Sequence, residues 1–333
     1  MSYTNGLDNP ELYFQTKLYT GNGSTNAITL DGDENMQPDW VWVKDRGRAG
    51  YNHNSYDSVR GATKLIWQNL TNAENTYADS LTSFNSDGFT LGADSSNGEV
   101  NVNTQSYVAW NWKESATAGF DIVTFTGSGG TQNISHSLSA KPEWIITKSR
   151  SASGAWYTYH GANTAAPETD FLKLNDTDAT ADNATVWNDT APTTSVFTVG
   201  SAFDNTTTYI AYCFAEKKGY SKFGSYTGNG NAEGPFIYTG FKPAFVIQKR
   251  TDSSSNWTMV DNKRDVDNIV NTQVIANGNG AEFSENVFDF LSNGFKVRAV
   301  HGGYLNASGG SYIYMAFAES PFVNSNGVPN NAR

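Results

Sequence analysis

A pattern that recurs three times along the chain constrains its fold more than any other feature. Each copy is a proline, then a run of aromatic and β-branched residues, then a basic residue, and the copies occupy residues 37–46, 141–150 and 242–250. A proline ahead of such a run is typical of a β-strand that is entered from a loop. Self-similarity at a period of about 100 residues predicts a chain built from equivalent structural units.

Two further landmarks keep the same order in every unit. An aromatic-Thr-Gly turn precedes each proline, and an aromatic-rich run closes each unit. The turns occupy residues 19–21, 125–127 and 226–228, and the closing runs occupy residues 107–114, 209–216 and 312–319. Asp87-Gly88 in the first unit and Asn293-Gly294 in the third suit the positive φ angles of a hairpin turn. These landmarks predict a unit of short antiparallel strands that is present three times.

The composition favours many short strands joined by polar turns. The chain has 31 glycines, only 17% of its 333 residues are charged, and no long apolar periodicity marks an extended helix. We therefore expect an all-β fold of three tandem homologous β-sandwich domains, jelly-roll or lectin-like, of about 100 residues each. The expected domains are residues 14–116, 117–218 and 219–323, between an N-terminal docking arm at 1–13 and a C-terminal extension at 324–333.

Residues 1–13 have no counterpart ahead of the second and third units. The residues of this segment indicate turns and show no strand pattern. Two interpretations are therefore open: a disordered terminus, or an arm that docks on a partner. In the second interpretation Leu12, Tyr13 and Phe14 are the docking candidates, since large apolar side chains anchor interfaces.

The charge and hydropathy patterns restrict the expected partners. A net charge of −11 argues against a protein that follows nucleic-acid phosphates, so no nucleic-acid partner is expected. The sequence shows neither an apolar run as long as a transmembrane helix nor the apolar segment of a secretion signal after Met1. Membrane insertion and classical secretion are therefore not expected. Cys213, the single cysteine, is expected to be a small packed residue rather than a nucleophile.

Two Asp-x-x-Arg pairs are the most prominent polar motif. Asp57 and Arg60 follow the first repeated proline at nearly the same distance at which Asp261 and Arg264 follow the third. The middle unit has His160 at the corresponding place. We favour a structural ion pair that braces a loop, which is the commoner role of such pairs. A site for a sugar or a carboxylate is the alternative.

No metal, cofactor or catalytic motif stands out. The histidines lack metal-ligand spacing, and the acidic loops at 31–34 and 176–182 lack the bidentate glutamate of a strong calcium loop, although calcium binding there stays open. The chain has no phosphate-binding glycine loop and no Gly-x-Ser-x-Gly elbow. We expect no metal, no cofactor and no enzymatic activity. A glycan-degrading enzyme, which needs only two suitably placed carboxylates, is the weakest alternative.

Several longer segments carry a resemblance to a known family. They are residues 7–23, 37–44, 57–64, 81–92 and 107–113 in the first unit, and residues 134–138 and 141–150 in the second. In these segments the chain resembles a family of repeat-built structural proteins from marine tailed bacteriophages, and the third unit is similar to it more loosely. The resemblance implies a virion component of tail-fibre type and supplies no catalytic residues.

The resemblance and the lack of catalytic motifs predict a non-enzymatic protein on the virion surface, made in the host cytoplasm. As a tail-fibre-type adhesin it would bind host surface glycans or proteins through exposed loops. The receptor-binding candidates are Tyr51, His53, Tyr159, His160 and Trp257. The alternative is a capsid decoration protein that stabilises or studs the head and docks through the N-terminal arm. Other virion proteins, of the tail or the capsid, are the expected partners, and homo-oligomer formation is left open.

Overall fold

The computed structural model describes residue 4 and residues 6–299 and 303–329. Within these ranges almost every regular element is a β-strand, and the only helices are a 3₁₀ turn, η1 (Pro10–Leu12), and one α-helical turn, α1 (Ala184–Trp187). The expected all-β, sandwich-like fold is therefore confirmed. No helix of this described part has the length and apolar character that a membrane crossing requires. The outer ends of the predicted arm and extension, residues 1–3, 5 and 330–333, lie outside the described residues.

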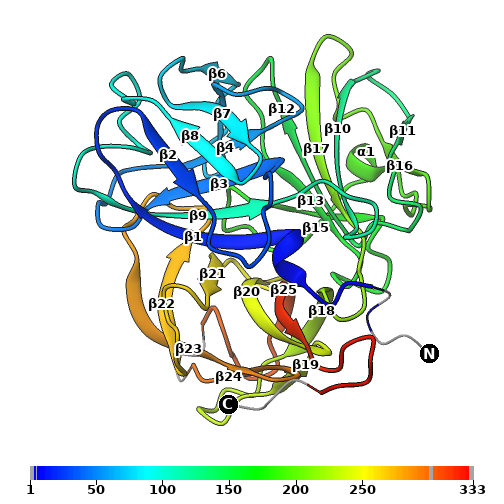
Figure 1. The fold of residues 1–333 in the computed structure, drawn as a ribbon. Helices are drawn as coiled ribbons and strands as arrows, with labels where there is room; N and C mark the ends of the chain where they lie inside the picture. Colours follow the sequence, from blue (N-terminus) through cyan, green and yellow to red (C-terminus); the bar gives the residue numbers. More distant parts are fainter. Residues whose placement is uncertain (1–3, 5, 300–302, 330–333) are drawn as a thin grey trace.

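Three large antiparallel sheets form the body of the molecule (Figure 1). In spatial order, the first contains β1 (Phe14–Thr20), β9 (Ser106–Trp112), β3 (Trp40–Asp45), β4 (His53–Asp57), β5 (Lys64–Trp67) and β6 (Asn75–Thr76). The second contains β10 (Phe120–Thr126), β17 (Thr208–Phe214), β12 (Trp144–Ser149), β13 (Tyr157–His160), β14 (Asp170–Lys173) and β15 (Ala181–Asp182). The third contains β18 (Ser221–Thr227), β25 (Ser311–Pro321), β20 (Phe241–Arg250), β21 (Trp257–Asp261), β22 (Val270–Ile275), β23 (Phe283–Leu291), β24 (Gly294–Val297) and β19 (Phe236–Tyr238).

Shorter strands cover the outer face of each large sheet. The first is covered by β2 (Asn26–Thr29), β8 (Gly88–Leu91) and β7 (Leu81–Asn85), and the second by β11 (Gln132–Ser135) and β16 (Val196–Val199). In the third, β23, β24 and β19 are continuous with the large sheet and curl over it, so Phe288, Phe295 and Ile237 share a core with Val246. Each large sheet and its cover thus enclose a hydrophobic core of their own.

Each proline-led run of the sequence becomes the third strand of a large sheet. It pairs with the closing aromatic run of the same unit: Trp40 lies opposite Trp112, Trp144 opposite Phe214, and Phe245 opposite Phe317. The two strongest landmarks of the repeat are therefore neighbours in every sheet. The first five strands also follow one another in the same way in all three sheets.

The alternation of residues in the proline-led strands supplies two separate cores. Successive side chains of a strand point to opposite faces of its sheet. In β3, Val41 and Val43 face the outer core of the first unit, whereas Trp40 and Trp42 face a central cluster. This central cluster contains residues of all three large sheets, among them Phe214 from the second.

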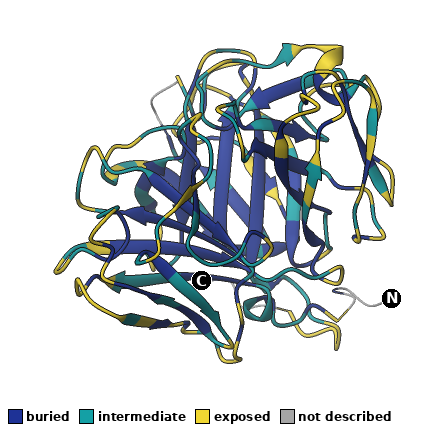
Figure 2. Cartoon of the chain, turned by 90° about the horizontal axis from the view of Figure 1, so that it is seen from above, coloured by how far each residue is buried: buried dark blue, intermediate teal, exposed yellow. Residues whose placement is uncertain are grey.

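Aromatic rings join the three sheets within the central cluster. The Trp40 ring lies 4.6 Å from that of Trp112 in its own sheet and 4.4 Å from that of Tyr212 in the second. Phe245 of the third sheet lies 5.9 Å from Trp112. Viewed from above, the buried strands converge on the middle of the molecule, and the exposed residues lie in loops around the rim (Figure 2). Because the units share this cluster, their division into three separate domains stays a prediction.

A closed ring of hydrogen bonds links each unit to the next. Each donor stands at, or immediately before, the start of the fourth strand of one sheet, and each acceptor is the carbonyl of the last residue of the fifth strand of another. The bonds run from Trp156 Nε1 to Trp67 (2.9 Å), from Trp257 Nε1 to Lys173 (2.9 Å) and from His53 Nε2 to Ile275 (3.0 Å). The second unit therefore binds the first, the third binds the second, and the first binds the third.

The N-terminal segment packs against its own chain. Leu7 is buried in the central cluster, and the Tyr13 ring lies 6.0 Å from that of Tyr220. Phe14 is also buried, and its ring stacks 5.2 Å from that of Phe317. The prediction of a free docking arm is corrected here for Phe14, because its side chain fills the central cluster. Leu12 and Tyr13 are only partly covered.

Candidate functional site

The structure places most of the predicted receptor-binding residues in the interior. His53, Tyr159, His160 and Trp257 are all buried. Their expected position on exposed loops is therefore corrected. His53, His160 and Trp257 stand at the ends of strands and bond to a neighbouring sheet. Tyr159 lies inside β13, and its ring packs in the outer core of the second unit. Tyr51 is half-buried, and the Arg48 guanidinium lies 3.7 Å from its ring centroid.

Buried histidines take part in contacts between units rather than in ligand binding. His160 Nε2 lies 3.1 Å from the carbonyl oxygen of Tyr314, in the third sheet. Burial lowers the pKa of His160 to about 4, so the ring is neutral at physiological pH. His53 has its pKa lowered well below the usual range by the same cause. A neutral ring with one N–H is suited to a fixed structural hydrogen bond.

The Asp-x-x-Arg pairs are buried structural ion pairs, as the favoured interpretation predicted. Asp57 binds Arg60, and Asp261 lies 2.7 Å from Arg264, with all four side chains fully covered. Each aspartate also accepts a hydrogen bond from a neighbouring sheet: Tyr212 Oη donates to Asp57 (2.7 Å), and Trp110 Nε1 donates to Asp261 (3.1 Å). No surface is left at these pairs for a sugar or a carboxylate.

Cys213 is buried in the outer core of the second unit, as expected of a packed residue. Burial raises the pKa of its thiol well above the usual value, so it is unsuited to nucleophilic attack. Among the described residues, no group of three or more His, Cys, Asp or Glu side chains is arranged to hold a metal ion.

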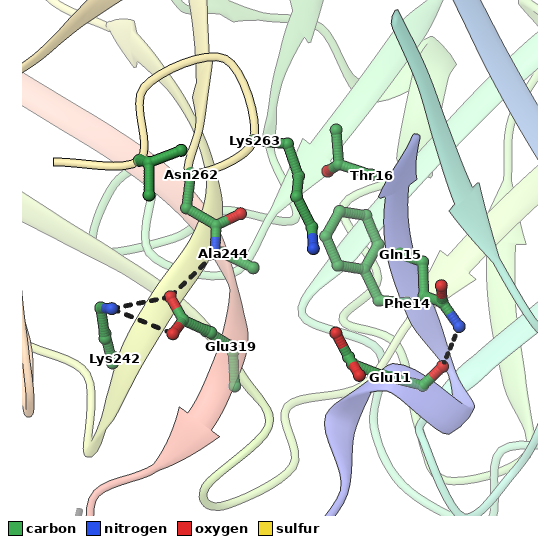
Figure 3. Close-up of a pocket in the computed structure, with 11 residues that line it drawn as sticks. Glu11, Phe14, Gln15, Thr16, Lys242, Ala244, Asn262, Lys263 and Glu319 are labelled. Atoms are coloured by element: carbon green, nitrogen blue, oxygen red, sulfur yellow. Dashed lines mark hydrogen bonds and ion pairs between the residues drawn. The ribbon is translucent and has the colours of Figure 1, made fainter. Parts of the chain in front are cut away.

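A cleft of about 280 Å³ lies where the third sheet meets the start of the first (Figure 3). Its walls come from η1 and β1 on one side and from β20, β25 and the loop after β21 on the other. The lining residues are Glu11, Phe14, Gln15, Thr16, Lys242, Ala244, Asn262, Lys263, Val266, Ala318 and Glu319. We call this cavity the junction cleft.

Hydrogen bonds hold the polar walls of the junction cleft in place. The Glu319 carboxylate lies 2.9 Å from Lys242 Nζ and accepts a bond of 2.8 Å from Asn262 Nδ2. On the opposite wall, Gln15 Nε2 donates to the Glu11 carbonyl (2.9 Å). The side chains are thus fixed by neighbours before any ligand arrives, which lowers the entropic cost of binding.

Two oxygen atoms in the walls lack a hydrogen-bond partner in the described part of the chain. They are Oγ1 of Thr16, a residue only 4% exposed, and Oδ1 of Asn262. A buried polar atom without a partner costs about 1–3 kcal/mol. Such atoms in a cleft indicate a place where a ligand or a water molecule completes the hydrogen bonding.

The remaining lining is balanced in charge and partly apolar. Glu11 and Glu319 carry negative charges, and Lys242 and Lys263 carry positive ones. Figure 3 shows the Lys263 ammonium and the Glu11 carboxylate directed into the space between the walls. Phe14 lines the cleft but is only 2% exposed, so the exposed Val266 supplies accessible apolar carbon. This mixture of donors, acceptors and apolar carbon suits a neutral ligand with several hydroxyl groups, since each hydroxyl both donates and accepts.

Sequence reasoning missed the junction cleft, although part of it lies next to the repeated landmarks. Lys242 immediately precedes the third repeated proline, Glu319 ends the third closing run, and Asn262 lies inside the second Asp-x-x-Arg motif. The landmarks therefore mark one wall. Nothing in the sequence indicates that Thr16 and Gln15 form the other, because those residues meet the third sheet only through the tertiary fold.

The fold and its cleft define an all-β protein of three sheets around a shared aromatic core. Comparison with protein families finds a match over residues 9–321 to a family described as "Domain of unknown function (DUF7483)". The chain belongs to this family, since the match includes all three large sheets. No curated protein matches the chain.

Proposed function

We propose that this chain is a non-enzymatic structural protein on the surface of a tailed-phage virion, where it acts as a tail-fibre-type adhesin. In this proposal the junction cleft binds a neutral saccharide of the host surface. The virion assignment rests on the resemblance of the sequence segments described above. The saccharide rests on one observation: the cleft presents two oxygen atoms without partners between charged walls of balanced sign.

A pyranose ring matches these groups in chemistry. When the Thr16 and Asn262 side chains turn toward the cleft, its hydroxyls can donate to their two buried oxygen atoms and accept from the Lys263 ammonium, while its C–H face covers the exposed side chain of Val266. No histidine or cysteine lines the cleft, and Glu319 is already bound by two side chains. Binding without turnover is therefore the favoured role of this site.

A valine substitution tests the saccharide site directly. Thr16→Val keeps the shape of the side chain and removes the oxygen without a partner. We expect it to weaken binding to a printed panel of bacterial surface glycans at least tenfold, while the protein becomes slightly more stable because a buried unpaired oxygen is lost. Thr258→Val is the matched control, since Thr258 Oγ1 is also buried without a partner but lies outside the cleft. Equal glycan binding by both variants and the wild type would exclude the cleft as the saccharide site.

Immunogold labelling of intact virions tests the location. Gold on the tail or its fibres is expected for an adhesin. The alternative, a capsid decoration protein, is favoured by the compact body of three sheets around one shared cluster, and it predicts gold over the head. If the protein is absent from purified particles, the virion proposal is wrong.

A further inference from the structure

A second cleft lies at the boundary between the second and third sheets. Its volume is about 370 Å³. The lining residues are Glu216, Lys218, Ser221, Lys222, Tyr238, Thr239, Gly240, Phe322 and Val323. They come from the end of one closing run, the start of β18, the end of β19 and the segment after β25.

The two clefts share equivalent positions of the repeat. Phe14 begins β1 opposite Trp112, and Ser221 begins β18 opposite Phe317, so Phe14 and Ser221 are equivalent. It follows that Gln15 of the junction cleft corresponds to Lys222 of the second cleft.

The carboxylates of the two clefts correspond in the same way. Glu319 and Glu216 each stand two residues after the aromatic residue that faces the start of the first strand, Phe317 in one case and Phe214 in the other. Both clefts are thus built on the boundary between one unit and the beginning of the next, around the same carboxylate position.

The second cleft differs by an exposed aromatic ring on its rim. The Tyr238 side chain is 59% exposed, and Phe236, two residues earlier in β19, is 47% exposed. Residues two apart in a strand share a face, so the two rings form one apolar platform. Large aromatic side chains that remain open to solvent beside a cleft with a few charged groups are typical of binding surfaces.

Charged groups lie beside this platform. Lys222 Nζ is 2.7 Å from Glu216, and both side chains are about one-third exposed, which leaves part of each accessible to a ligand. Lys218 adds a second positive charge to the lining. A carboxylate and an ammonium group at one point bind vicinal hydroxyls well, because one accepts and the other donates.

We propose that this cleft is a second saccharide-binding site, in which a pyranose ring stacks on Tyr238 and its hydroxyls bind Glu216 and Lys222. The inference rests on the proposed function of the junction cleft and extends it: one chain carries two saccharide sites at equivalent boundaries. Two sites on one rigid body bind a repeating surface polysaccharide more tightly than either site alone, because the second contact is intramolecular.

Binding stoichiometry tests this proposal. The probes are methyl glycosides of glucose, galactose, mannose, N-acetylglucosamine and glucuronic acid, and the corresponding trisaccharides. They are screened by saturation-transfer NMR, and the binders are titrated by calorimetry. The wild-type protein is expected to bind two saccharides per chain. Tyr238→Ala is expected to retain only the junction cleft as a binding site, and Thr16→Val only the second cleft. Tyr238→Phe is expected to retain both sites, since the stacking ring is kept.

Phe283→Ala is the matched control, because Phe283 is an exposed aromatic residue outside both clefts. Its stoichiometry is expected to equal that of the wild type, and the thermal midpoints of all variants establish that they are folded. If the wild-type protein binds one saccharide per chain and Tyr238→Ala still binds it, the second cleft is not a saccharide site and the junction cleft is. If the wild-type protein binds one saccharide and only Tyr238→Ala abolishes this binding, the junction cleft is not a saccharide site. Absence of binding by every probe would overturn both.

Discussion

The Nε2 atom of His53 lies 3.0 Å from the carbonyl oxygen of Ile275, although 222 residues separate them in the sequence. The other ring nitrogen, Nδ1, accepts a hydrogen bond of 2.9 Å from Trp42 Nε1, so Nε2 carries the proton and donates it. This bond closes the ring between the first and third units. The last unit is thereby fixed to the first, and the chain forms a closed arrangement rather than an open row of units.

We expect the whole chain to unfold in one cooperative transition. The central cluster and the ring of hydrogen bonds join all three sheets, so no unit can open without exposing apolar surface of the others. Differential scanning calorimetry should give a van't Hoff enthalpy equal to the calorimetric one. Three separable transitions would show that the units are independent domains, as the sequence alone predicted.

The buried pair of Asp57 and Arg60 should be far more important for stability than an exposed pair. Asp57→Asn removes the nearer counter-ion of the covered guanidinium and leaves only Glu74, 3.4 Å away, so the loss is expected to approach the roughly 3–5 kcal/mol of a broken buried pair. Asp31→Asn is the control, because the Lys17–Asp31 pair is more than half exposed at the carboxylate and such pairs contribute about 0–1 kcal/mol. Urea denaturation measures both. Similar losses for the two variants would contradict the structural role of the buried pair.

Acid should destabilise the protein through its buried histidines. His160 has a pKa of about 4 in the folded chain, because burial disfavours its charged form, and an ordinary value of 6.5 in the unfolded chain. Between these values the unfolded chain binds a proton that the folded chain does not, so stability falls as the pH decreases from 6.5 toward 4. The maximal contribution is about 1.4 kcal/mol per pH unit for each histidine.

Urea midpoints at several pH values in this window measure that effect. Glu114 acts in the opposite direction, since burial raises the pKa of its carboxyl to about 7. The comparison is therefore made with His160→Gln, which keeps a donor for the Tyr314 carbonyl and does not titrate. A smaller pH dependence is expected for this variant. An unchanged slope would mean that His160 is protonated in the folded protein.

Mild alkali should stabilise the protein through three buried lysines. Lys44, Lys148 and Lys249 occupy equivalent positions in β3, β12 and β20, and burial lowers the pKa of each to about 8. Above this value the folded chain loses protons that the unfolded chain keeps up to its pKa of 10.5, so stability rises with pH. The clearest window is pH 8 to 9, because above it Cys213 and the buried tyrosines act in the opposite direction.

Lys148→Met tests the lysine effect, because the pKa of Lys148 is lowered mainly by burial and further by the positive charge of Arg60. Denaturation midpoints at pH 7, 8 and 9 should increase less steeply in the variant than in the wild type. Lys113→Met serves as the comparison, since the Lys113 side chain is only partly covered. Parallel curves for Lys148→Met and the wild type would contradict the shifted pKa.

The sequence predicted the strands well where the signal is local. The alternation Trp40-Val41-Trp42-Val43 marks a strand with two apolar faces, and the structure gives each face its own core. The Asp-x-x-Arg spacing predicted a brace, and both pairs are braces. The prediction that the receptor candidates are exposed was wrong, because their burial depends on contacts that are not local. His53 and Trp257 look like loop residues in the sequence, yet they stand at strand starts that contact the neighbouring unit.

The sequence by itself determined the all-β class, the strands of each sheet and the alternation that provides two cores, because these depend on residues within a few positions of one another. The tertiary structure alone decided that three sheets share one aromatic cluster, that Phe14 is buried in it, and that Thr16 meets Asn262 across a cleft. These contacts join residues from opposite ends of the chain. Their partners are set by how whole sheets pack together, and no local pattern records that packing.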